Sequence, residues 1–484
     1  MTPWPPSQPP PDNPGGGVVR CSRDGAPRES SPRIVGGRSE GGHATPVRSA
    51  RKAGPLKARA FLPAALGCLA LAALLVPAVA VAQRFDARRP QTFTVGAPQG
   101  DSPAARVDAR RSGYSRGPLP TSALRAIWHR SIGVDVDEAP LVGADGEIVV
   151  IASRGDVVWL APEGQERFRT SAGLGTPGPG ALLSDGTVVV VDGNGEAVGL
   201  RRGAVRFRTR VGERNSAQKA APLALEDGGV VVAVAAELAA LDADGGVRAR
   251  ATLPEPAVWP LVAAQGKVAA VTAQGAIYLW TPGREPLLAG SFGGPILGGV
   301  TAADGHTLLA VVEGSRLDAV DLEHGVTVVR GAVPPGTATI LLGPPSMRGG
   351  AAYLLELVLG SVVAVAVDPA GQQIMRTTVA TTASTLLADG GVAPLVAPSF
   401  TPTLVDSAGT LAFGTPDGGV GVVAPDGAVE TLGEPVCQGG GSSRPRWPTA
   451  APRSGPAFAG FAPAGLGGFV VACANGTIAK VAGP

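Results

Sequence analysis

Two cysteines are the residues whose type and spacing most directly suggest chemistry. Cys437 lies in the irregular segment EPVCQGGGSSRPRWP, and Cys473 follows 36 positions later in the apolar run FVVACA. Two thiols with no histidine near them in the sequence are too few for a metal site. In an oxidising compartment such a pair forms a disulfide. We therefore predict a bond between Cys437 and Cys473 that clasps the last structural unit; two unrelated buried thiols are the alternative.

Other side chains with ligating or catalytic chemistry do not form a constellation in the sequence. His129, His306 and His324 are scattered, without the pair spacing of a zinc site. The run Asp192-Gly-Asn-Gly-Glu196 alternates oxygen ligands, but it lacks the distal glutamate of a calcium loop and is predicted to be a hairpin turn. No catalytic residue and no metal ligand is therefore predicted.

Three further patterns favour a structural interpretation. Trp159 and Trp280 lie at or beside equivalent positions of a repeat and are predicted to pack between its units. The acidic residues within 135–138 are predicted to lie in a solvated loop. Residues 154–156 spell Arg-Gly-Asp, an adhesion tripeptide, but they are predicted to form the turn between two strands.

Residues 60–82 carry no charge and read AFLPAALGCLALAALLVPAVAVA, after a basic stretch and before Gln83. A basic region, an apolar core and a small-x-small end predict a secretory signal that is cleaved after Ala82. The run is also long enough to span a bilayer, and 59 residues precede it. The alternatives are therefore a start downstream of Met1 or a retained membrane anchor, which would be the chain's membrane contact.

Charge and residue composition divide the rest of the chain into an N-terminal tail, a linker and a main body. Residues 1–59 carry ten basic and four acidic residues and are rich in Pro, Gly and Ser, so we expect a disordered basic tail. Residues 83–120 have few aliphatic pairs and are expected to be a linker. From residue 83 onward, 31 basic residues face 35 acidic ones, which gives no electrostatic reason to expect a nucleic-acid partner.

A repeat of short strands begins near residue 121. The chain's 70 glycines and 46 prolines argue against a helical fold, because both residues destabilise helix interiors. Runs of Val, Ala, Leu and Ile alternate with Asp-Gly, Gly-Gly or Asn-Gly, which are hairpin signals. The ends of the third strands align at Leu160, Leu200, Leu241, Trp280, Val320, Val367, Val423 and Val481.

The spacing of these positions predicts the architecture. The intervals are 40, 41, 39, 40, 47, 56 and 58 residues, which suits units of four short strands with insertions around 376–400 and 434–462. We predict an all-β propeller of eight four-stranded blades over 121–484, with seven blades as the alternative. The strand around Trp128, in ALRAIWHRSIG (123–133), should complete the last blade, which lacks an outer strand, and so close the ring.

The repeat resembles a known family. Segments such as LAALDADGGVRAR and AVAVDPAGQQIMR are similar to the repeat of pyrroloquinoline-quinone-type propellers over about 123–484. That family contains quinone-dependent dehydrogenases and cofactor-free relatives, including the propeller lipoprotein of bacterial outer-membrane protein assembly. The dehydrogenases resemble one another in an adjacent cysteine pair, a tryptophan floor and a calcium site. This chain has no adjacent cysteines, so the resemblance is closer to the cofactor-free relatives.

The functional expectation follows from this resemblance. We expect a non-catalytic, exported, monomeric propeller of the periplasm or cell envelope that binds a protein partner and needs no cofactor. The alternative is a quinone- or metal-dependent oxidoreductase of the same propeller family. The sequence names neither the partner nor the propeller face that binds it, because propellers support many unrelated functions.

Overall fold

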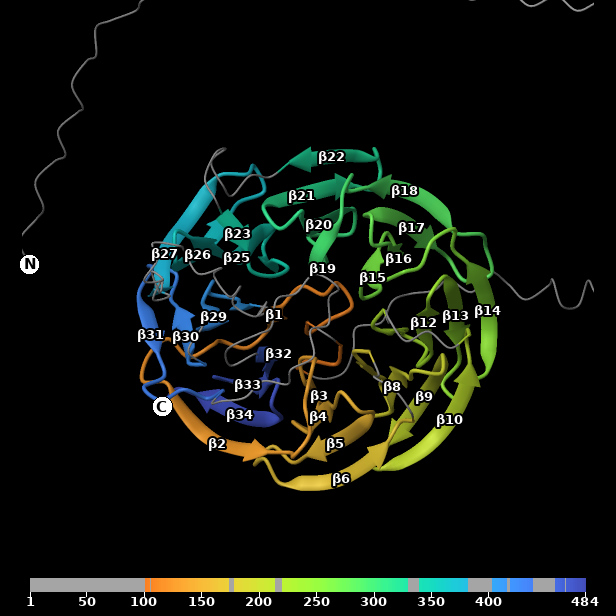
Figure 1. Cartoon of the computed structure of the whole chain (residues 1–484), viewed down its shortest axis with the longest axis horizontal. Coiled ribbons are helices and arrows are strands. Elements are labelled where there is room, and N and C mark those ends of the chain that lie inside the picture. Colours follow the sequence, from red (N-terminus) through yellow and green to blue (C-terminus); the bar gives the residue numbers. More distant parts are fainter. Residues whose placement is uncertain are drawn as a thin grey trace, which may run out of the picture. The chain divides into compact units, whose positions relative to one another are not determined.

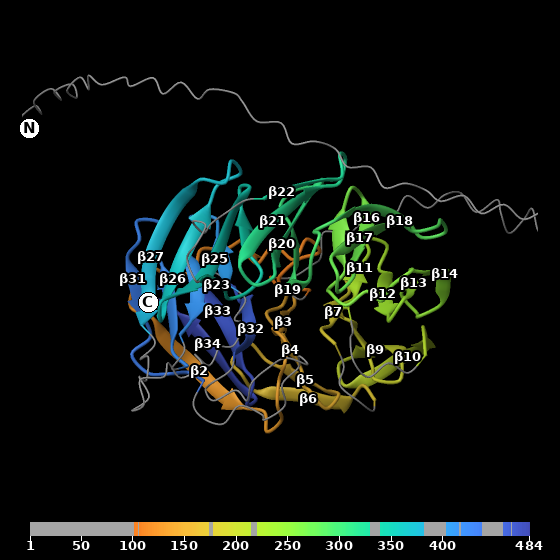
Figure 2. The same cartoon turned by 45° about the horizontal axis from the view of Figure 1, so that its top comes forward.

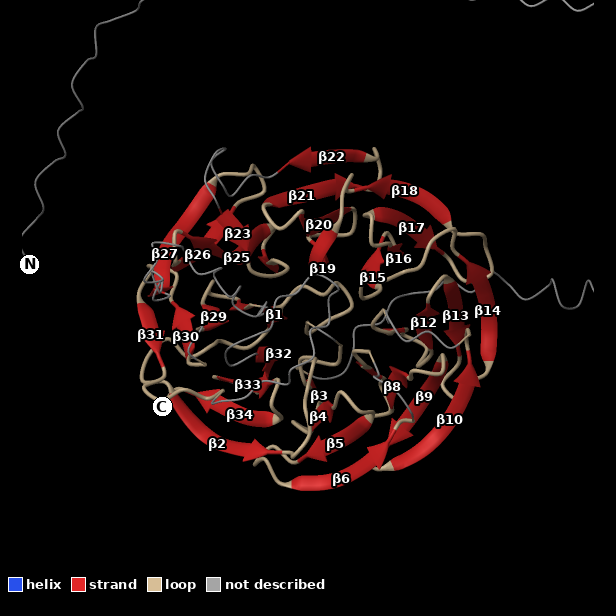
Figure 3. Cartoon of the chain, viewed as in Figure 1, coloured by secondary structure: helices blue, strands red, loops and turns tan. Residues whose placement is uncertain are grey.

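The computed structural model describes residues 101–104, 106–173, 178–213, 220–329, 339–381, 403–415, 418–437, 458–465 and 467–484. All regular elements among these residues are β-strands (Figure 3). The strands form eight sheets, which are arranged as blades in a ring (Figure 1). The predicted all-β propeller with eight blades is therefore confirmed, and the seven-bladed alternative is excluded.

The first four blades follow one another along the chain. Blade 1 comprises β3 (Leu141–Val142), β4 (Ile148–Ile151), β5 (Asp156–Leu160) and β6 (Glu166–Ser171). Blade 2 comprises β7 (Ala181–Leu182), β8 (Val188–Val191), β9 (Glu196–Arg201) and β10 (Ala204–Arg210). Blade 3 comprises β11 (Leu223–Ala224), β12 (Val230–Val234), β13 (Glu237–Leu241) and β14 (Val247–Thr252). Blade 4 comprises β15 (Val262–Ala264), β16 (Lys267–Val271), β17 (Ala276–Trp280) and β18 (Leu287–Ser291).

The remaining blades include two strands from the N-terminal side. Blade 5 comprises β19 (Ile296–Ala302), β20 (Thr307–Val312), β21 (Arg316–Asp321) and β22 (Val326–Val329). Blade 6 comprises β23 (Thr339–Leu341), β24 (Ser346–Arg348), β25 (Ala351–Val358), β26 (Ser361–Val367) and β27 (Gln373–Thr381). Blade 7 comprises β1 (Tyr114–Ser115), β28 (Leu404–Asp406), β29 (Leu411–Gly414), β30 (Val420–Val423) and β31 (Val429–Thr431). Blade 8 comprises β2 (Arg125–Ser131), β32 (Phe458–Pro463), β33 (Gly468–Cys473) and β34 (Thr477–Ala482).

The residue composition of each strand matches its place in the blade. Second strands such as β8, VVVV, are buried throughout, because neighbouring blades cover both of their faces. Outer strands such as β6, ERFRTS, are mostly exposed and correspondingly charged. Glycines supply the left-handed backbone conformation in the hairpin turns, as at Gly245, where φ is 85°.

The ring closes between the N-terminal and C-terminal strands. β2 pairs antiparallel with β34, with Arg125 opposite Ala482 and Ser131 opposite Thr477. A bulge between Ala126 and Trp128 interrupts the register. The outer edge of β34 is thereby covered, and the predicted closure through the Trp128 strand is confirmed.

The apolar core is divided into eight clusters, each of which lies between two neighbouring blades. One cluster joins Val158 of blade 1 to Val470 of blade 8 and therefore closes the ring by packing as well. The two tryptophans predicted to pack between units do so. Trp159 lies between blades 1 and 2, Trp280 lies between blades 3 and 4, and both are fully buried.

An aromatic side chain on the outer strand also contacts the turn glycine of the following blade. A Cβ atom added to Gly164 would lie 2.7 Å from the ring of Trp128, and one added to Gly245 would lie 2.5 Å from the ring of Phe207. The indole Nε1 of Trp128 donates to the carbonyl oxygen of Pro162 at 3.0 Å. These contacts explain why the repeat combines a turn glycine with an aromatic residue near the end of the unit.

The predictions for residues 1–100 lie outside the described residues. These are the basic tail at 1–59, the signal peptide or anchor at 60–82, and the first part of the linker. The insertions predicted around 376–400 and 434–462 lie mostly outside them as well. Within the described part of the chain, no helix is long and apolar enough to cross a membrane.

Candidate functional site

The centre of the ring, where a propeller has its channel, is occupied by the chain itself. Residues 101–104 and 106–119, which we call the central strap, pass among the innermost strands of the blades (Figures 1 and 2). The end of the strap forms β1, which pairs in parallel with β28 of blade 7. These residues were expected to belong to a linker over 83–120. The difference arises because the strap binds mainly through its main chain and two arginines, and only a few aliphatic side chains, such as Val107 and Leu119, enter the core.

Six backbone amides of the inner wall donate hydrogen bonds to strap carbonyl oxygens, at distances of 2.7–2.9 Å. The donors come from blades 1, 2, 4, 5, 6 and 7, and they are Val142, Leu182, Ala263, Ala302, Met347 and Val405. The acceptors, in the same order, are Ser102, Pro103, Ala109, Arg110, Ser112 and Gly113. The strap thus satisfies a ring of main-chain donors that would otherwise face the channel.

Arg106 anchors the strap between blades 5 and 6. One terminal nitrogen donates to the hydroxyl of Thr301 at 2.5 Å, and the other donates to the carbonyl oxygen of Pro345 at 2.6 Å. The side chain is 8% exposed. Burial lowers the pKa of Arg106 to about 9, which still leaves the guanidinium group charged at neutral pH.

Arg111 makes the corresponding contact between blades 3 and 4. Its Nε donates to the carbonyl oxygen of Leu261 at 3.0 Å, and Nη2 donates to that of Pro222 at 2.6 Å. The side chain is fully buried, and its pKa is lowered by this burial to about 10. The charges of Asp108 and Glu138 act in the opposite direction. The planar guanidinium group suits such a site because it donates in several fixed directions at once.

A turn in the strap directs the two arginines to different blades. The carboxylate of Asp108 accepts hydrogen bonds from the amides of Arg110 and Ser112 and from the hydroxyl of Ser112. Arg106 and Arg111 have φ angles of 56° and 57°, which are uncommon for residues with a Cβ atom. Non-glycine residues keep such angles when surrounding contacts impose them, as the wall contacts do here.

The described part of the channel is therefore lined by groups that bind a peptide segment, the strap. The terminal nitrogens of Arg106, the Nε and Nη2 of Arg111 and the strap carbonyl oxygens are matched by carbonyl oxygens, a hydroxyl and amides of the wall, while Arg106 Nε has no hydrogen-bond partner among the described residues. No cysteine or histidine lies among the strap residues that the structure describes. The arrangement provides binding and structural closure.

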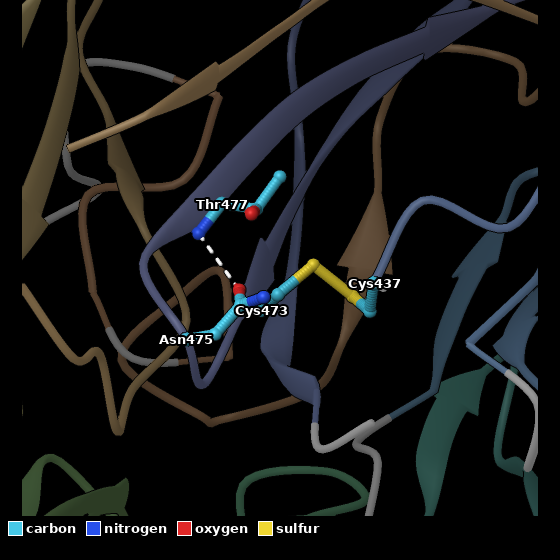
Figure 4. Close-up of a disulfide and its surroundings, with 4 residues drawn as sticks. All are labelled: Cys437, Cys473, Asn475 and Thr477. Atoms are coloured by element: carbon cyan, nitrogen blue, oxygen red, sulfur yellow. Dashed lines mark hydrogen bonds between the residues drawn. A yellow bond between two sulfur atoms is a disulfide. The ribbon is translucent and has the colours of Figure 1, made fainter. Parts of the chain in front are cut away.

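Cys437 and Cys473 form a disulfide, with an S–S distance of 2.00 Å and a Cα–Cα distance of 5.5 Å (Figure 4). The amide of Cys437 donates to the carbonyl oxygen of Gly418, in the turn between β29 and β30 of blade 7. Cys473 ends β33 of blade 8, next to a turn in which Asn475 Oδ1 accepts a hydrogen bond from the amide of Thr477. The bond therefore joins two blades, which corrects the expectation of a clasp within the last unit.

Blade 5 brings together side chains that are scattered in the sequence. His306 Nδ1 lies 3.0 Å from a carboxylate oxygen of Glu323, and His324 Nδ1 lies 2.9 Å from one of Asp321. The ligand atoms of Asp321, Glu323 and His324 lie within 4.8 Å of one another. Hydrogen bonding to Asp321 raises the pKa of His324. Both histidines are more than half exposed, and local turns and ion pairs account for these positions without a metal ion.

The remaining sequence candidates are structural. Asp192 accepts hydrogen bonds from the amides of Asn194 and Glu196, which confirms the predicted hairpin turn. Arg154 and Gly155 lie in the turn between β4 and β5, and Asp156 begins β5. The acidic residues within 135–138 lie in the connection from β2 to β3 and are half-buried rather than fully solvated. The signal that sequence reasoning missed is the Arg-x₄-Arg pair of the strap, at positions 106 and 111.

Comparisons with known proteins give a likeness of fold. No family model and no curated protein matches this chain. Among solved structures, BamB from Moraxella catarrhalis is 16% identical over 75% of this chain and 98% of its own, with a TM-score of 0.49. The computationally designed Ika8 protein is 12% identical over 73% of this chain and 100% of its own, with a TM-score of 0.51. A europium-containing methanol dehydrogenase is 11% identical over 69% of this chain and 86% of its own, with a TM-score of 0.48.

The fold and its repeat define the class of protein. The chain is an eight-bladed β-propeller. The resemblance predicted from the sequence is thereby confirmed at the level of the fold. At these identities the likeness carries no activity or partner over to this chain.

Proposed function

We propose that this chain is a non-catalytic, exported β-propeller that acts as a monomeric protein-interaction or scaffolding module of the cell envelope. The observation that carries the proposal is the central strap. Its main chain and its two buried arginines take up the hydrogen-bonding groups of the inner wall, where a propeller enzyme would bind a cofactor or substrate. Binding surfaces then remain on the faces and the outer rim.

Two further observations support export to the envelope. The disulfide between Cys437 and Cys473 is the kind of bond that forms and persists in an oxidising compartment. Residues 60–82 have the sequence features of a secretory signal or an anchor. The resemblance of the repeat to cofactor-free envelope propellers agrees with both.

The outer strand of blade 4 differs chemically from those of blades 1 to 3. In blades 1 to 3 the outer strands carry arginines, several of which are paired, such as Arg206 with Asp185 at 2.7 Å. In blade 4 the outer strand β18 reads LLAGS, without charge, and Leu287 and Leu288 are 65% and 66% exposed. A partner protein would therefore meet an exposed apolar strand at blade 4 and charged outer strands at blades 1 to 3.

One experiment separates this proposal from the oxidoreductase alternative. Purified protein is titrated with pyrroloquinoline quinone and calcium while absorbance and dye-linked alcohol oxidation are followed. We expect neither a saturable absorbance change nor turnover, because the strap occupies the inner wall. Saturable binding at micromolar quinone together with alcohol oxidation would overturn the proposal.

A second experiment tests the interaction role directly. Photo-crosslinking residues are placed at Leu288 of blade 4 and at Arg210, on the charged outer strand of blade 2, and the protein is irradiated in intact cells. We expect one position to give a discrete adduct with an envelope protein while the other does not. Adducts with cytoplasmic proteins alone would contradict the proposed location.

A further inference from the structure

The inner wall of the propeller has the properties of a peptide-binding site. Its six donor amides belong to inner strands of the blades, and the strap lies along the channel side of these strands, where its β1 pairs with β28. Sheet edges of this kind bind extended peptides through main-chain hydrogen bonds, while pockets for individual side chains provide specificity. β1 of the strap is such a parallel addition to blade 7, and single main-chain hydrogen bonds join the rest of the strap to the inner strands of the other blades.

Two pockets provide the specificity. The Arg106 pocket is built from Thr301, Pro345 and neighbouring acceptors, and the Arg111 pocket is built from the carbonyl oxygens of Leu261 and Pro222. Both pockets present uncharged acceptors to several guanidinium nitrogens. A lysine ammonium group is a compact point charge and cannot make the same set of contacts.

The wall also restricts which residue can stand at one position of the strap, Gly113. At Gly113 the φ angle is 61°, and a Cβ atom there would lie 2.3 Å from the Oγ atom of Ser346. A side chain is therefore excluded two residues after Arg111. By contrast, Arg110 is exposed between the two pockets, so its side chain is not recognised.

We propose that the inner wall is a receptor for a peptide with the pattern Arg-x₄-Arg-x-Gly and a turn between the two arginines, which in this chain is supplied by residues 101–104 and 106–119. The occupant is a separable ligand, so the same wall binds that peptide when it is supplied by a different molecule. This inference rests on the same strap as the proposed function, but peptide uptake and the quinone titration test the two separately.

The test makes the strap exchangeable in the full chain. A recognition sequence for a site-specific protease is inserted between Ser122 and Ala123, which are exposed. After cleavage, the protein is held in urea below its unfolding midpoint with an excess of a fluorescent synthetic peptide of residues 101–119. Native buffer is then restored, and uptake is measured by fluorescence anisotropy and gel filtration.

We expect saturable uptake of one peptide per propeller. Peptides with Arg106→Lys or Arg111→Lys should bind about tenfold more weakly, and the matched Arg110→Lys peptide should bind like the original. Absence of uptake, or equal affinity of all four peptides, overturns the proposal. Loss of the fold on cleavage that added peptide does not restore also overturns it, because the strap is then inseparable from the ring. None of these results bears on the quinone titration.

Discussion

One buried strand of blade 6 carries an ionisable side chain, the carboxyl group of Glu356. Glu356 on β25 is 1% exposed, and its Oε2 accepts a hydrogen bond from Arg376 at 2.8 Å. Burial raises the pKa of Glu356 above its ordinary value, while Arg376 acts in the opposite direction. Because the effect of burial is the larger, the folded state holds this proton more firmly than the unfolded chain does.

This difference predicts a pH dependence. A carboxyl whose folded-state pKa is raised binds more protons folded than unfolded, so its contribution to stability falls as pH rises. Glu356→Gln removes the titration. The free energy of unfolding of the wild type, relative to that of Glu356→Gln, should therefore decrease as the pH rises above the ordinary pKa of a glutamate. Urea unfolding at several pH values measures it, and parallel curves for the two proteins would contradict the prediction.

At the scale of elements, blades are joined by contacts between an outer strand and the next turn. The ring of Phe207 on β10 lies over Gly245, in the turn between β13 and β14. Gly283 is its counterpart in blade 4, with a φ of 84° against 85° for Gly245. Nothing lies within 4 Å of a Cβ atom at Gly283, so the two glycines differ in their contacts rather than in backbone conformation.

Alanine substitution at the two positions separates these effects. Gly283→Ala should cost about 1 kcal/mol, from the left-handed backbone alone. Gly245→Ala should cost about 1–3 kcal/mol more, because Phe207 must move out of its packed position. The midpoints of chemical unfolding report both values. Equal losses at the two sites would show that the aromatic contact does not join the blades.

The disulfide acts between elements of two blades. It closes a loop of 36 residues, for which chain entropy gives a stabilisation of about 4 kcal/mol. The double substitution Cys437→Ser and Cys473→Ser should lower the unfolding midpoint by a corresponding amount. Wild-type protein in reducing agent is the matched control and should shift equally. Free thiols at both positions in denatured, exported protein would contradict the bond itself.

For the whole molecule, the strap determines where the folded unit begins. The six wall amides and two arginine pockets connect it to seven blades, so the ring includes residues well before 121. A chain that begins at residue 101 should fold into a compact propeller. A chain that begins at residue 121 should be strongly destabilised, because the wall amides lose their acceptors.

Circular dichroism, gel filtration and urea unfolding of the two truncated chains measure this difference. Limited proteolysis of the full chain should likewise spare the strap and cut before it. Equal stability of the two truncated chains would contradict the role of the strap. The propeller would then be closed by β2 and β34 alone.

The sequence by itself determined the repeated architecture. The interval near 40 residues, the Asp-Gly turns and the apolar second strands are local patterns, and each predicts a local structure. Closure through the strand of Trp128 could be inferred because the last unit lacks an outer strand. The disulfide could be proposed from the two cysteines, since few other arrangements suit them.

The tertiary structure decided what occupies the channel and which blades the disulfide joins. Main-chain carbonyl oxygens are the same in every residue, so a segment bound through its backbone has no compositional signature and looks like a linker. The contact of His306 with Glu323, and the return of Cys437 to blade 7, depend on which turns the ring brings together. Sequence periodicity specifies each blade, but only the closed ring creates the inner wall that binds the strap.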